Sequence, residues 1–207
     1  MRAPAVSAGV FKWQKDTFAM SYALITPAAE EPVTLAEAKA FLRLDGSDED
    51  ALLGDLIATA RDYLEMVSGL SLVTQGWRLY RDDWPASGMV SLAHGPVQSV
   101  GAVTVYDREG MASAVPQDQA RLDGRARPAR FYMPGLAGRR AGCNGIEVDF
   151  TAGFGAAADV PDVAKQAILR HVAHMFSFRG VIAADQQPAG APEGYDRLIA
   201  PLKAWRL

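Results

Sequence analysis

The chain has 207 residues, enough for one domain with a sizeable core or for one domain that carries an insertion. Its composition is 49% hydrophobic and 22% charged with one cysteine, which excludes a disulfide-rich or low-complexity protein and favours a reducing cytoplasm. The formal net charge of −3 argues against a protein that wraps nucleic acid, and no apolar run approaches the roughly 20 residues of a membrane helix.

Residues 1–32 are expected to form a flexible N-terminal arm. Residues 1–19 contain two lysines but lack the continuous apolar core of a signal peptide. Two interpretations remain open for them: Met20 is the true start and the preceding stretch an extended gene assignment, or the stretch is a genuine arm. The residues from Ser21 to Pro32 indicate an extended segment.

Two helices are predicted within residues 34–69. Thr34 and Glu37 form a capping box, which opens a short helix that ends before Asp45 and Gly46. Ser47 is the expected cap of a second, longer helix, whose first turn carries carboxylates that oppose the helix dipole. The second helix ends at a left-handed Gly69 cap, and its apolar stripe consists of Leu53, Ile57, Ala60, Leu64 and Val67.

The hydrophobic pattern changes from a period of 3.6 to a period of 2 over residues 72–153. Val103 and Val105, for example, alternate with polar neighbours, and turn-forming pairs such as Asn144-Gly145 separate the alternating runs. We expect an antiparallel sheet of about five strands. The Gly-, Pro- and Arg-rich residues 116–142 are expected to form long loops.

A third helix is expected over residues 160–179, with Pro161 in its first turn. Residues 181–207 follow as a linker and an apolar C-terminal tail. Because no single amphipathic helix can bury its stripe alone, the three are expected to pack together. The sequence therefore predicts an α+β fold: a small bundle of three main helices plus the C-terminal helical tail, with the sheet inserted between helices 2 and 3. The predicted main domain covers residues 33–180, and the linker and tail follow it.

Four patterns suggest catalytic or ligand-binding chemistry, and each has a simpler structural explanation. His171 and His174 have metal-ligand spacing on one helix but lack further ligands nearby, so a hydrogen-bonded core histidine is favoured for His171. Cys143 would need a histidine base to act as a nucleophile, and His94 cannot be placed beside it from sequence. We therefore predict no catalytic residue, no metal site and no cofactor.

The other two patterns are a glycine pair and an acidic cluster. Gly153 and Gly155 follow a predicted strand, but neither a third glycine nor a Lys-Ser/Thr pair follows them, so they fit a strand-to-helix connection better than a phosphate loop. The acidic cluster lacks the spacing of a calcium loop, and helix capping plus a solvated face explains it; it contains Asp45, Asp48, Glu49, Asp50 and Asp55.

An arginine-rich segment with a single acid, Asp123, and no lysine covers residues 121–140. Arginine forms bidentate hydrogen bonds with carboxylates and phosphates. Three interpretations remain open: a contact with an acidic protein surface, a contact with nucleic acid, and a solvated loop. Of the two contacts, the one with protein is favoured. The candidate interface residues are Arg121, Arg125, Arg127, Arg130, Arg139 and Arg140.

The C-terminal tail carries large apolar residues at helical spacing after the linker. Tryptophan and arginine are frequent anchors of protein interfaces. Packing of the tail back onto its own domain and binding of the tail to a partner are both consistent with this pattern. The residues concerned are Tyr195, Leu198, Ile199, Leu202, Trp205, Arg206 and Leu207.

From about Pro32 onward, the order of these segments resembles the phage head–tail connector family, in the subgroup that carries a β-sheet insertion and also occurs in gene transfer agents. Each stretch alone consists mostly of residues that cap helices or pack in a core. The resemblance depends on the order in which the stretches follow one another along the chain. The matching stretches are Glu31-Pro32-Val33-Thr34-Leu35-Ala36-Glu37-Ala38-Lys39, Asp50-Ala51-Leu52-Leu53, Gly95-Pro96-Val97-Gln98-Ser99-Val100, Thr151-Ala152-Gly153-Phe154-Gly155 with Val160-Pro161, Arg179-Gly180 and Trp205-Arg206-Leu207.

The resemblance implies a structural adaptor rather than an enzyme: a ring, typically a dodecamer, in the neck of a virion or virus-like particle made in a bacterial cytoplasm. Such a ring lies between the portal protein and a stopper or tail-completion protein, and it extends the DNA channel without sequence-specific binding. The resemblance also places the portal contact in the C-terminal tail, at Tyr195, Leu198, Leu202, Trp205, Arg206 and Leu207.

Three alternatives compete with the adaptor. A stopper or tail-completion subunit belongs to the same class of particle. A metal-dependent hydrolase would use His171 and His174. A DNA-binding module would use the arginine-rich segment.

Overall fold

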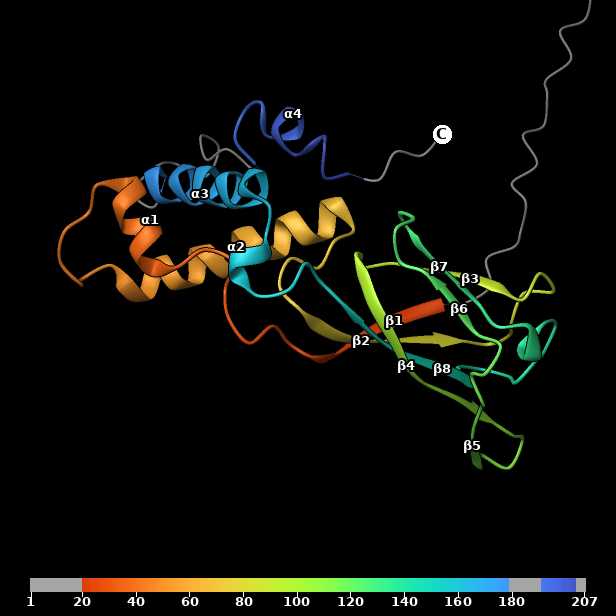
Figure 1. Ribbon diagram of the computed structural model, residues 1–207. Helices are drawn as coiled ribbons and strands as arrows, with labels where there is room; N and C mark the ends of the chain where they lie inside the picture. The colour runs from red at the N-terminus through yellow and green to blue at the C-terminus, as the bar shows by residue number, and fades with distance from the viewer. Residues whose placement is uncertain (1–19, 179–190, 204–207) are drawn as a thin grey trace, which may run out of the picture.

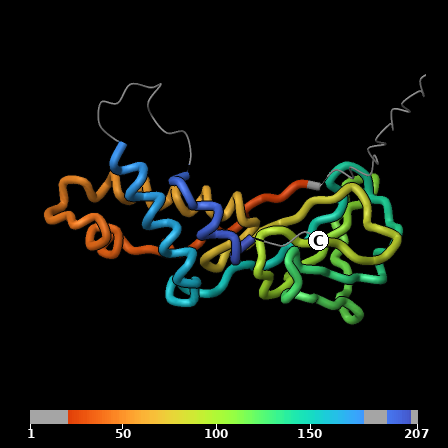
Figure 2. Tube along the Cα trace, turned by 90° about the horizontal axis from the view of Figure 1, so that it is seen from above, coloured from red at the N-terminus to blue at the C-terminus, as the bar shows by residue number. Residues whose placement is uncertain are grey.

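The structure, a computed structural model, describes residues 20–178 and 191–203. Its helices lie at one end of an elongated molecule and its strands at the other (Figure 1). The view from above shows the same division (Figure 2). The helices are α1 (Leu35–Leu42), α2 (Asp50–Ser68), α3 (Asp162–Ser177) and α4 (Tyr195–Ile199), with 3-10 turns η1 (Pro134–Leu136) and η2 (Ala157–Asp159).

The strands form two antiparallel sheets. A five-stranded sheet has the order β1-β2-β8-β4-β5, and a three-stranded sheet has the order β3-β7-β6. The α+β class with antiparallel sheets is thus confirmed. The strands are β1 (Met20–Thr26), β2 (Gln75–Arg81), β3 (Met89–Leu92), β4 (Val97–Tyr106), β5 (Ala112–Ala114), β6 (Arg121–Asp123), β7 (Ala129–Tyr132) and β8 (Ile146–Ala152).

Each end of the molecule has its own hydrophobic core. The helical core joins the apolar stripes of α2 and α3, including Leu53, Leu64 and Ile168, which are fully or almost fully buried. The β core draws side chains from both sheets, such as Val148 and Phe131. All the strands except β1 lie between α2 and α3 in chain order, so the helical core closes across the β segment.

Residues 20–26 differ from the expected free arm. They form β1, an edge strand of the five-stranded sheet, paired antiparallel with β2 from Met20 opposite Arg81 to Thr26 opposite Gly76. The Tyr22 hydroxyl donates to the Ser91 carbonyl at 3.2 Å and accepts from the Ala93 amide at 3.1 Å. The sequence indicated an extended segment here but not its pairing, because the partner residues lie 50 to 61 positions further along the chain.

The arginine-rich residues 116–142 also differ from the prediction of long loops. They contain β6 and β7, in which Leu122 and Phe131 point inward opposite one another. The strands are only three and four residues long, too short for their alternation to stand out against the surrounding glycines, prolines and arginines.

The helix termini agree with the predicted signals at α1 and depart from them at α2. Thr34 and Glu37 form the predicted capping box. Gly69 ends α2 with a φ of 69°. However, α2 begins at Asp50 rather than directly after Ser47, because the Ser47 carbonyl accepts from the Asp50 amide in a turn that precedes the helix.

Candidate functional site

The C-terminal helix α4 packs against the helical core. Tyr195 and Leu202 are 3% and 6% exposed, and Ile199 is fully buried. The Tyr195 ring meets the rings of Tyr63 and His171 edge-on, with centroids 5.7 and 5.4 Å apart. In this conformation, Tyr195 and Leu202 are therefore core residues of their own chain and are not presented to a partner.

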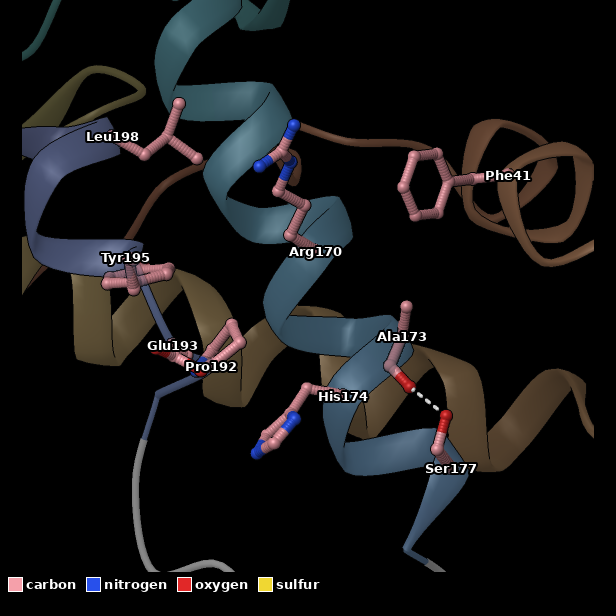
Figure 3. A pocket seen from close by; sticks show the side chains of 10 residues that line it. Phe41, Arg170, Ala173, His174, Ser177, Pro192, Glu193, Tyr195 and Leu198 are labelled. Carbon is pink, nitrogen blue, oxygen red and sulfur yellow. Dashed lines mark hydrogen bonds between the residues drawn. The ribbon is translucent and has the colours of Figure 1, made fainter.

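A pocket of about 360 Å³ lies where residues 192–198 meet α1 and α3. Half-buried Leu198 lines it together with Phe41, Arg170 and His174 (Figure 3). The Ser177 hydroxyl donates to the Ala173 carbonyl within α3 at 2.7 Å. Of the residues assigned to a partner contact, Trp205, Arg206 and Leu207 lie outside the described part of the chain.

The histidine pair on α3 shows no metal-site geometry. His171 is 4% exposed, and its Nδ1 has no hydrogen-bond partner among the described residues, in contrast to the hydrogen-bonded core histidine that we expected. Burial lowers the pKa of His171, and the neighbouring His174 lowers it further, so the ring is held neutral. Within residues 20–178 and 191–203, no group of three His, Cys, Asp or Glu side chains could hold a metal ion.

The remaining chemical candidates have structural surroundings. His94 is stacked on Trp77 with ring centroids 3.7 Å apart, and burial lowers its pKa. Cys143 is exposed in the turn before β8. In the acidic cluster, Asp50 pairs with Lys39 at 2.7 Å, whereas Asp45 and Asp48 are exposed.

The glycine pair lies in the connection from β8 to α3. A Cβ added to Gly153 would lie 2.6 Å from the Val73 carbonyl oxygen, so the close approach of these two backbones requires glycine there. The Thr74 amide donates to the Gly155 carbonyl at 2.9 Å. These residues are thus placed in a strand-to-helix connection packed against the chain that enters β2.

The six candidate arginines are all exposed, but the structure does not bring them into one patch. Arg121 and Arg130 lie on the outer face of the three-stranded sheet, where Arg130 pairs with Asp123 at 2.5 Å. Arg139 and Arg140 follow η1. Arg127 lies apart from them, beside a groove at the boundary with the helical end.

A partly buried polar network that sequence reasoning missed connects the segment before α1, helix α2 and the start of β2. Arg61 bonds Glu31 at 2.8 Å and lies 3.6 Å from Glu65. Glu65 accepts from the Leu72 amide at 2.7 Å and from the Gln75 side chain at 3.0 Å. The burial of Glu65 raises its pKa. The sequence could have indicated part of this network, because Arg61 and Glu65 are four residues apart on a predicted helix, the spacing of a helical ion pair.

No helix in the described residues is long and apolar enough to cross a membrane. The described residues offer surfaces and grooves for protein contacts. Most of their ionisable side chains are exposed or paired, whereas the His171 Nδ1 and the Tyr195 hydroxyl are buried without a hydrogen-bond partner among them.

Similar solved structures include chains from gene transfer agent necks and from a gene transfer agent virion. A chain in the neck of an empty gene transfer agent particle, computed with C6 symmetry, has 26% sequence identity and a TM-score of 0.75, over 90% of this chain and 97% of that chain. A chain of the native gene transfer agent virion has 27% identity and a TM-score of 0.73, over 90% and 96% of the two chains. A chain in the native neck computed with C12 symmetry has 27% identity and a TM-score of 0.71, over 90% and 97%.

No curated protein matches the chain significantly. Residues 32–121 match the family of phage gp6-like head–tail connector proteins. That segment covers α1, α2 and the strands from β2 to β5, which carried the first part of the resemblance in the sequence. Over residues 32–121, this protein is therefore similar to the phage head–tail connector family.

Proposed function

We propose that the chain is a non-catalytic adaptor subunit that forms a ring in the neck of a tailed-phage-like particle or gene transfer agent, between the portal and the next tail component. The observation that carries the proposal is the likeness to neck chains over 90% of this chain at TM-scores of 0.71 to 0.75. The C12 symmetry of one such neck supports a dodecamer. A ring of this kind surrounds and extends the DNA channel.

The charge of the chain suits that role. A ring through which DNA slides must avoid strong phosphate contacts, because each one slows passage. The net charge is −3, and the six candidate arginines are spread over several surfaces instead of forming one basic stripe. Apart from Arg130, which pairs with Asp123, the six candidate arginines are instead available for acidic surfaces of the neighbouring proteins.

The portal contact belongs, in this proposal, to the end of the C-terminal tail. Tyr195 and Leu202 are buried and hold α4 in place, so they would act by anchoring the segment. Leu198 at the pocket, together with Trp205, Arg206 and Leu207 beyond the described residues, would supply the contact itself.

A truncation after Lys203 tests this assignment. It removes Trp205 while leaving the buried anchors of α4 and the Lys203–Asp196 pair intact. We expect the truncated subunit to keep its circular dichroism spectrum and melting temperature but to be lost from portal-containing particles. Undiminished attachment would contradict the tail assignment, and electron microscopy showing the subunit remote from the portal would favour a stopper instead.

A further inference from the structure

A groove with a volume of about 510 Å³ lies where the C-terminal end of α2 meets the loops of the β end. Its wall is largely apolar and includes Met66, which is 72% exposed, together with Leu92 and Pro128. A methionine left this open at a concave site is available to a partner side chain, and methionine adapts well to such contacts.

The charged groups of the groove all have one sign. Arg127 and Lys203 line it, and no Asp or Glu does. Lys203 pairs with Asp196, whose side chain is 87% exposed, and Arg127 has no ion pair within the described residues. The groove therefore suits an apolar side chain that is accompanied by a carboxylate.

The hairpin that joins β4 to β5 presents such a pair of side chains. Met111, the last residue of the loop before β5, is 66% exposed, and Glu109 in the same loop is exposed as well. The tip is ordered before any contact, because the Asp107 carboxylate accepts from the Glu109 amide at 3.0 Å and from the Met111 amide at 2.8 Å. A preorganised tip loses little conformational entropy when it binds.

The hairpin and the groove lie on opposite sides of the molecule. In Figure 1, β5 projects at the lower edge, whereas the end of α2, α4 and β7 border the upper edge. A contact between these two surfaces therefore joins different copies head to tail, and such contacts close into rings when the rotation allows. In such a contact the elongated subunits lie side by side, because the two surfaces face away from each other perpendicular to the long axis of the molecule.

We propose that the β4–β5 hairpin tip of one copy inserts Met111 into this groove of the next copy, with Glu109 facing Arg127. The inference rests on the proposed ring function and names the surfaces by which the ring closes. The chain's own residues 204–207 are the competing occupant. They carry Arg206, whose charge has the same sign as Arg127 and Lys203, so they fit the groove less well.

Disulfide cross-linking in purified particles tests the contact in a Cys143→Ser background. With Met66→Cys and Met111→Cys in the same chain, we expect oxidation to give a ladder of covalent multimers that ends at the closed ring. Two populations carrying one change each, expressed together, should also cross-link, and either population alone should not. Met89→Cys replaces Met111→Cys in the control, because Met89 is 41% exposed on the other sheet, and there we expect no ladder.

The outcomes separate this inference from the ring function. Rings seen by electron microscopy without a cross-link between positions 66 and 111 would overturn the inference and leave the adaptor role standing. In the isolated subunit at high concentration, cross-linking that appears only after removal of residues 204–207 would identify the chain's own tail as the occupant and also overturn the inference. Absence of the unmodified subunit from particles would instead refute the proposed function.

A charge exchange provides a second measurement. Glu109→Arg and Arg127→Glu should each weaken ring assembly by about 2- to 5-fold, the range for a partly exposed ion pair. Combining both changes should restore assembly, since the pair is re-formed with its signs reversed. Losses that simply multiply in the combined variant would contradict a direct contact.

Discussion

His171 lies on the buried face of α3 with the rings of Tyr63 and Tyr195 against it. Protonation would put a charge among these rings, so burial lowers its pKa from the ordinary 6.5. The folded state then binds the proton less readily than the unfolded chain. Stability is fully present above pH 6.5 and falls as the pH drops toward the folded-state pKa, by about 1.4 kcal/mol for each pH unit between the two values.

Replacing this side chain should therefore change the pH dependence. We expect His171→Gln to flatten the fall in the free energy of unfolding between about pH 7 and pH 5, as measured by urea denaturation at several pH values. His94→Gln is a comparison variant at the β end, where burial also lowers the pKa of the histidine, so we expect the same kind of flattening there. An unchanged slope in His171→Gln would show that its imidazole is not held neutral by the fold.

Individual residues also show why the sheet's polar face was hard to foresee. Arg78 on β2 bonds Asp149 at 2.5 Å and Glu147 at 3.1 Å, both on the neighbouring strand β8. In the sequence these residues are only the polar half of two alternating runs. Their pairing depends on the register of β2 against β8, which places Arg78 directly opposite Asp149.

At the scale of elements, α4 has five residues and cannot be stable alone. Its docking depends on the buried apolar surface of Tyr195, Ile199 and Leu202. Hydrogen bonding contributes little at Tyr195, because its hydroxyl has no partner among the described residues, and burial raises its pKa to about 12.

Two substitutions at this position separate packing from polarity. Tyr195→Ala should destabilise the docked helix by about 2–4 kcal/mol, through the loss of a large buried side chain. Tyr195→Phe should be neutral or slightly stabilising, since the unpaired hydroxyl is costly to bury. Hydrogen exchange of the α4 amides measures both effects, and equal losses in the two variants would mean that the hydroxyl has a partner after all.

Several elements could be predicted from the sequence because their signals are local. The capping box at Thr34, the Gly69 cap and the stripe of α2 each lie within one stretch of chain. The strands β6 and β7 were missed because their short runs are stabilised only by pairing with each other and with β3. The strand β1 was placed in an arm for the same reason.

At the scale of the whole molecule, two cores at opposite ends share one elongated body (Figure 2). The polar network around Arg61 and Glu65 connects the helical end to the start of β2. A second connection is the hydrogen bond that the Trp77 indole donates to the Ser71 hydroxyl at 3.0 Å.

The adaptor role also predicts a weak interaction with DNA. With a net charge of −3 and dispersed arginines, the free subunit should show no submicromolar binding to duplex DNA at physiological salt. Fluorescence anisotropy over a salt series measures this. Tight binding that falls steeply with salt would point instead to a DNA-binding surface that uses the arginines of residues 121–140.

The sequence by itself determined the α+β class, the main helices and their caps, the mild negative charge and the family resemblance, because each depends on local periodicity, composition or segment order. Only the tertiary structure decided that β1 joins the sheet and that Tyr195 and Leu202 belong to the core. It alone also showed the groove that faces away from the β4–β5 hairpin. These features depend on contacts between segments far apart in the chain, which no local pattern encodes.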